Sequence, residues 1–74
     1  MTADQLKDLL HATPFVPFKI FVAEQKEYDV PHPDFALLSY GGRVMAVNST
    51  ERDVIHLINV PLISRIETKE TKSA

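Results

Sequence analysis

The chain of 74 residues has no cysteine, only two glycines and no excess of basic charge, and each shortage excludes a class of function. Without cysteine it can form no disulfide and no thiolate metal site. Its glycines, Gly41 and Gly42, are adjacent, so no glycine-rich loop can cradle a phosphate. Eight basic residues against ten acidic ones give no general basic field, and we expect no DNA binding.

Long hydrophobic runs are also missing. No apolar run approaches the roughly 18 residues of a membrane span. The first residues include Asp4 and Asp8, whereas a secretory leader begins with basic residues. We therefore expect a soluble, cytoplasmic protein with no membrane partner.

The size of the chain predicts self-association. A domain this small buries only roughly 60% of the surface that its unfolded chain exposes. Its core supplies no more than about 3–5 kcal/mol unless disulfides, a metal or other subunits add to it. Because cysteine is absent, a homo-oligomer is the expected reinforcement.

A helix is predicted from Ala3 to His11. Thr2 and Gln5 have the spacing of a reciprocal capping box. One apolar stripe follows at helical spacing and must lie on a sheet, because so short a helix is unstable alone. The stripe consists of Leu6, Leu9 and Leu10. Pro14 ends the helix, and we expect Phe15 and Phe18 to lie between helix and sheet.

Strand patterns occupy the rest of the chain, with turn signals every eight to twelve residues. We expect strands at Phe18–Ala23, Lys26–Val30, Phe35–Tyr40, Arg43–Val47, Val54–Ile58 and Leu62–Glu67. The connections are a turn at Glu24-Gln25, a bend at Pro31–Asp34, a polar turn at Asn48–Asp53 and a break at Asn59–Pro61. The pattern predicts one domain over residues 1–67, a sandwich or small barrel, and a flexible tail over 68–74.

Two of these connections carry specific predictions. Gly41-Gly42 between apolar runs predicts a two-residue type I′ hairpin turn, in which both glycines have positive φ. In the Pro31–Asp34 bend, Asp34 is expected to cap or stabilise the turn.

The sequence contains no recognisable catalytic or metal-binding set. His11, His32 and His56 are 21 and 24 residues apart, so nothing local brings metal ligands together. No serine lies in a glycine-flanked elbow, and the acidic residues of strands and turns are normally solvated. We predict a protein that is not an enzyme and binds no cofactor.

The order of elements resembles the Sm-like family, including its Hfq-like bacterial members. It comprises a first helix, a bent strand pair, a hairpin and a short last strand, Leu62-Ile63-Ser64-Arg65-Ile66. The resemblance implies a mainly β (α+β) fold, in which the helix caps a strongly bent antiparallel SH3/Sm-like barrel of five to six strands.

Aligned in this way, Lys26–Phe35 is the bent second strand and Phe35–Gly42 an insertion. The Lys-His pair that the bacterial members carry before their last strand is replaced by Ile58-Asn59. The family implies a homo-oligomeric ring through the fourth and fifth strands. It also implies RNA as a possible partner.

A second resemblance joins the chain to a group of small bacterial proteins without an assigned activity. The shared motifs are Leu-Leu-x-Ala-x-Pro-Phe-x-Pro-Phe, at Leu9–Phe18, and His-Pro-Asp-Phe, at His32–Phe35. This resemblance implies a shared fold.

Two functions stay open at this point. The first is a self-associating β-barrel module that binds RNA, with contacts expected at Arg43, His56, Asn59 and Arg65. The second is a protein–protein adaptor that uses a strand edge or the helix face. In both, the expected structural residues are Leu6, Leu9, Leu10, Phe15, Phe18, Gly41 and Gly42.

Overall fold

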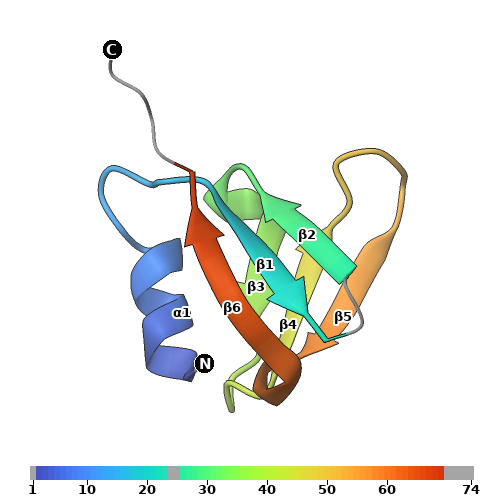
Figure 1. Ribbon diagram of the computed structural model, residues 1–74. Coiled ribbons are helices and arrows are strands. Elements are labelled where there is room, and N and C mark those ends of the chain that lie inside the picture. The colour runs from blue at the N-terminus through green and yellow to red at the C-terminus, as the bar shows by residue number, and fades with distance from the viewer. Residues whose placement is uncertain (1, 24–25, 70–74) are drawn as a thin grey trace.

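A computed structural model describes residues 2–23 and 26–69. The chain forms one helix and six strands, with two short 3-10 turns, so the mainly β prediction is confirmed (Figure 1). The elements are α1 (Ala3–Leu10), β1 (Phe18–Val22), β2 (Lys26–Val30), η1 (Pro33–Phe35), β3 (Ala36–Leu38), β4 (Val44–Asn48), β5 (Ile55–Asn59), η2 (Val60–Leu62) and β6 (Ile63–Thr68).

The strands form two antiparallel sheets of three strands each. The first sheet has the order β2-β1-β6 and the second β3-β4-β5. The chain passes from the first sheet to the second through η1, which lies between β2 and β3 (Figure 1). Neither sheet closes on itself within residues 2–23 and 26–69.

The helix begins with the predicted capping box. The Thr2 amide donates to Gln5 Oε1 at 3.1 Å, and the Gln5 amide donates to Thr2 Oγ1 at 3.2 Å. The helix ends at Leu10, one residue earlier than predicted, and the His11 amide bonds to the Lys7 carbonyl at 2.9 Å. With eight residues, this helix is too short and too polar to cross a membrane, and the described residues contain no other α-helix.

The core lies where the two sheets and the helix meet. Leu6 and Leu10 are buried from the helix side, and Leu9 is half-buried against the same cluster. Phe18, at the start of β1, is fully buried, and its ring centroid lies 5.9 Å from that of Phe15. The remaining buried side chains come from both sheets and η2: Ile20, Val30, Met45, Val47, Ile58, Val60 and Ile63.

The predicted two-residue turn at Gly41-Gly42 is wrong. The connection from β3 to β4 runs over residues 39–43, and only Gly42 has a positive φ, 74°. Its amide closes the turn on the Ser39 carbonyl at 2.9 Å. The reason lies in Ser39, whose Oγ accepts the amides of Arg43 and Val44 at 3.2 and 3.1 Å. These bonds hold Ser39 at the turn, and Phe35 belongs to η1, so the predicted Phe35–Tyr40 strand is shortened to β3 at both ends.

The bend before β3 is capped by a different residue from the one predicted. The Asp34 amide donates to Nδ1 of His32 at 3.2 Å, so the histidine is the capping side chain. Pro33 then occupies the first position of η1, where its missing amide costs no hydrogen bond.

Several boundaries also shift by one or two residues. Asn48 belongs to β4, and Ser49 begins the following turn, its Oγ accepting the amides of Glu51 and Arg52, each at 3.0 Å. Thr68 belongs to β6, and the Lys69 amide bonds to the Pro17 carbonyl at 2.7 Å. The predicted turn at 24–25 and the tail beyond Lys69 lie outside the described residues.

Candidate interaction surface

The four predicted RNA contacts do not form one patch. Arg43 and Asn59 are neighbours, because the amide that follows Asn59 bonds to the Arg43 carbonyl at 2.8 Å. His56, on β5, is half-buried and packs on the Tyr28 ring at a centroid distance of 4.9 Å. Arg65 lies on β6, in the other sheet.

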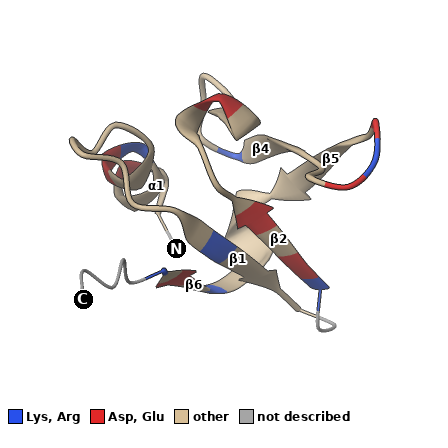
Figure 2. Cartoon of the chain, turned by 90° about the horizontal axis from the view of Figure 1, so that it is seen from above, with Lys and Arg blue, Asp and Glu red and all other residues tan. Residues whose placement is uncertain are grey.

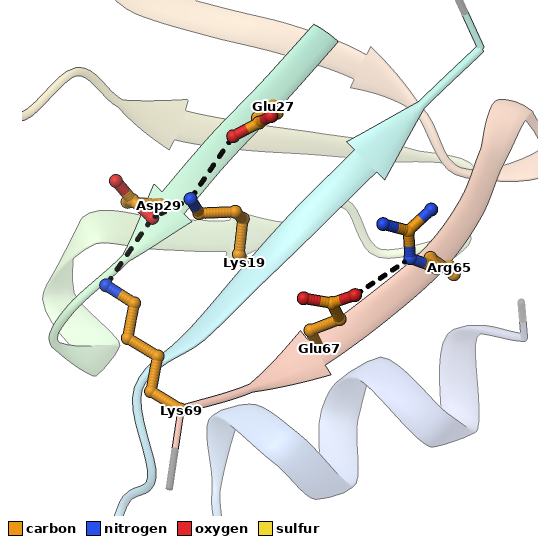
Figure 3. Close-up of polar contacts among 6 residues, drawn as sticks. All are labelled: Lys19, Glu27, Asp29, Arg65, Glu67 and Lys69. Atoms are coloured by element: carbon orange, nitrogen blue, oxygen red, sulfur yellow. Dashed lines mark hydrogen bonds and ion pairs between the residues drawn. The ribbon is translucent and has the colours of Figure 1, made fainter. Parts of the chain in front are cut away.

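Arg65 already has partners within the chain. Its guanidinium carbon lies 3.9 Å from the centroid of the Phe21 ring, and its Nε donates to Glu67 at 3.1 Å (Figure 3). Both contacts would compete with a phosphate for the guanidinium, although each is exposed and therefore weak.

The first sheet carries a network of ion pairs across its strands. Lys19 Nζ lies 3.2 Å from Glu27 and 3.9 Å from Asp29, and Asp29 also meets Lys69 Nζ at 3.6 Å (Figure 3). The hydrogen bond from Lys19 to Glu27 and the charges of Glu27, Asp29 and Glu67 raise the pKa of Lys19, against a smaller opposing effect of desolvation. Lys19, Arg65 and Lys69 each have an acidic neighbour on this surface.

The second sheet differs, because β4 and β5 contain no charged residue (Figure 2). Leu37 of β3 lies opposite Ala46 of β4, which lies opposite Leu57 of β5, so these side chains form a row across all three strands. Leu37 is 71% exposed, Leu57 74% and Ile55 60%. Together with Val44 and Ala46, they form what we call the outer face.

The ladder between β4 and β5 shows which backbone groups of β5 are bonded. At one end of the pair the Ser49 amide bonds to the Val54 carbonyl at 2.9 Å, and at the other the Val60 amide bonds to the Arg43 carbonyl at 2.8 Å. Bonded and non-bonded pairs alternate along an antiparallel ladder. The two bonds are six residues apart on each strand. Because six is an even number, both bonds indicate the same alternation of bonded and non-bonded pairs.

In this alternation His56 and Ile58 belong to bonded pairs, so their backbone groups point toward β4. Ile55, Leu57 and Asn59 therefore direct their N–H and C=O groups toward the outer side of β5, where no described strand pairs with them. Edge strands of monomeric proteins are commonly protected by charged residues or proline, and β5 contains neither. We call this row of backbone groups the open β5 edge.

A polar groove of about 400 Å³ lies between the two sheets. It is lined by Lys26, Glu27, Tyr28, Asp29, Val47, Asn48, Ser49, Thr50, Glu51, Arg52 and His56. In the part of the chain that the structure describes, no three histidine, aspartate or glutamate side chains gather around one point as metal ligands would. His11 follows α1, His32 precedes η1 and His56 lies on β5.

Comparison of the chain with protein-family models, with curated proteins and with solved structures finds no match in any of the three. Within residues 2–23 and 26–69, the open β5 edge and the outer face are the surfaces from which a function can be argued. Three of their residues, Leu37, Ile55 and Leu57, were not singled out from the sequence. An uncharged strand with apolar side chains on both faces, Ile55–Asn59, was the signal that could have indicated Ile55 and Leu57.

Proposed function

We propose that this protein is a non-enzymatic binding module that self-associates, and that β5 joins one copy to the next. The observation that carries the proposal is the open β5 edge, which combines unpaired backbone groups with exposed apolar side chains and no protecting charge. Pairing with a strand of another copy would satisfy these backbone groups and cover part of the Ile55 and Leu57 side chains.

The strand order supports an Sm-like arrangement. If β2 and β3 are two halves of one bent strand interrupted by η1, the six strands follow the order β6-β1-β2/β3-β4-β5 of an open, strongly bent barrel. The supposed insertion at Phe35–Gly42 then becomes β3 and its hairpin turn. In this arrangement β5 and β6 are the two end strands, and we propose that β5 of one copy pairs with β6 of the next.

The free energy that such a contact contributes can be compared with the stability of the single domain. Complete burial of a leucine or isoleucine side chain contributes about 1.5–3 kcal/mol. Because Ile55 and Leu57 are 60% and 74% exposed, each has at most about 1–2 kcal/mol still to gain, and a strand added beside β5 would supply part of it. In a chain whose own core supplies about 3–5 kcal/mol, two such side chains matter.

We propose protein rather than RNA as the main partner. RNA is implied by the Sm-like resemblance, whereas a protein partner was the alternative based on a strand edge or the helix face. The expected RNA contacts are dispersed, and Arg65 already contacts Glu67 and Phe21. RNA binding in the presence of excess competitor that weakens steeply with rising salt would contradict this preference, since apolar strand pairing depends little on salt.

The test of self-association is the native mass, measured by light scattering coupled to gel filtration over a range of concentrations. We expect the protein to exceed its chain mass of 8.4 kDa. If the protein is a monomer at every concentration up to about 1 mM, any self-association is weaker than almost every specific contact. This result would overturn the proposal.

The sharpest variant is Asn59→Pro. Its φ of −76° suits proline, and its amide points to the open edge, so the change removes an edge donor and places a ring in the path of an incoming strand. We expect a lower native mass than that of the wild type. The matched variant Asn59→Ala keeps the amide and should keep the mass. Equal masses for wild type and Asn59→Pro would show that β5 is not the joining strand.

A further inference from the structure

We infer that the outer face is a second and separate contact site for another copy of this chain. Two copies would pack outer face to outer face. If pairing at β5 forms a larger assembly, two such assemblies would then pack against each other. The inference rests on the proposed self-association only for the size of that assembly, because face packing can also join two single chains.

The row of side chains across the sheet supports a packing surface. Leu37 and Leu57 lie at the two ends of one row, with Ala46 between them, and Ile55 and Val44 lie on the same side of the sheet. Ala46 has a smaller side chain than the two exposed leucines that lie beside it. A second copy related by a two-fold axis could place a leucine over Ala46 and receive one in return.

The absence of charge on the outer face favours a second copy over a different partner. A face that carries charges of one sign repels its own copy, whereas an uncharged face does not. Asn48 lies at one corner, opposite Ile55. Its side-chain amide is both donor and acceptor, so it can pair with the same group of another copy.

The area of the face sets the expected strength. The exposed parts of Leu37, Ile55 and Leu57 together amount to roughly two whole apolar side chains, in a patch on the order of a few hundred Å². Stable interfaces bury about 800 Å² on each partner. The face contact should therefore be weak, and the fraction of paired chains should rise with protein concentration.

The experiment is sedimentation velocity on Asn59→Pro, with and without Leu37→Glu, between about 10 µM and 1 mM, the range of weak pairs. Leu37 lies on β3, separated from the open β5 edge by β4, and its exposure means that the glutamate removes little internal packing. We expect Asn59→Pro to approach twice the chain mass with increasing concentration. The added Leu37→Glu should keep it at one chain mass.

Leu62→Glu is the matched control, because it places the same carboxylate on another exposed leucine, in η2 rather than on the sheet. It should leave the pairing unchanged. If Leu37→Glu has no effect on the mass, or if Leu62→Glu lowers it equally, the face pairing is wrong and a partner other than a second copy covers the face.

A dilution series followed by amide NMR tests the same contact without any variant. On dilution of the wild type, the signals of Leu37, Ala46 and Leu57 should shift together, and an invariant set would overturn the inference. The two proposals fail separately. If β5 pairing is wrong, Asn59→Pro matches the wild type while Leu37→Glu still halves the mass; if face pairing is wrong, only Asn59→Pro changes the mass.

Discussion

Gly42 is the position where one added methyl group should do the most damage. It is buried, its φ is 74°, and a Cβ built on it would lie 2.5 Å from the Cβ of Ala3 in α1. Gly42→Ala therefore strains the backbone and pushes the β3–β4 turn away from the start of the helix.

The expected loss is the sum of two costs less one gain. A left-handed backbone costs an ordinary residue about 1–2 kcal/mol. Overpacking costs about 1–3 kcal/mol, depending on how far α1 can move. The reduced entropy of the unfolded chain returns about 0.4–1 kcal/mol. The net loss of about 1–5 kcal/mol is comparable with the whole stability of a core this small, about 3–5 kcal/mol.

Urea unfolding followed by circular dichroism measures the loss, and two further variants separate its causes. A Cβ added to Gly41 would meet nothing within 4 Å, and this glycine has no positive φ, so Gly41→Ala should lie within about 0.5 kcal/mol of the wild type or above it. Ala3→Gly should slightly destabilise the wild type but stabilise Gly42→Ala by removing the clash. A Gly42→Ala variant as stable as the wild type, or an Ala3→Gly effect of the same sign in both backgrounds, would refute the reasoning.

Three further predictions concern the core, the hairpin and the ion pairs. Phe18→Ala should cost about 3–5 kcal/mol in urea unfolding, and an unchanged midpoint would mean that the register of β1 is wrong. Ser39→Ala should cost about 1 kcal/mol, because the amides of Arg43 and Val44 lose their acceptor; thermal unfolding would show this as a lower midpoint, and Ser39→Thr should retain most of the stability. The raised pKa of Lys19 means that its charged form stabilises the fold, and this contribution is complete below pH 10.5 and disappears as the pH rises through the folded-state pKa. Above pH 10.5 the wild type should therefore lose more stability than Lys19→Met, and parallel thermal melts in both proteins would contradict this.

The helix and the approximate strand positions could be predicted because their causes are local. Thr2 and Gln5 are three residues apart and cap each other, whatever the rest of the chain does. Alternation around Phe18 and Ile20 likewise marks the buried face of β1 within five residues. The hairpin at Gly41-Gly42 was correctly expected, but its turn was not. The turn depends on Ser39 Oγ and on the approach of α1, and neither contact is part of the glycine pattern.

Most of the candidate site could not be predicted from the sequence, because it depends on contacts between segments that are far apart along the chain. Arg43, His56, Asn59 and Arg65 are separated along the chain, and only strand pairing shows that Arg43 and Asn59 are neighbours while Arg65 lies on another sheet. Likewise, Leu37 and Leu57 are twenty residues apart and become one row through Ala46.

By itself, then, the sequence determined a capped helix, a set of short antiparallel strands and a small core that gives only marginal stability. The hydrophobic spacing and the capping residues act between positions a few residues apart, so their effects do not depend on distant contacts. Only the tertiary structure decided which strands became edges and which apolar side chains stayed in water. Those outcomes depend on pairing between remote segments: once β4 lies between β3 and β5, the outer side of β5 has no partner within the described chain, and Leu37, Ile55 and Leu57 remain exposed.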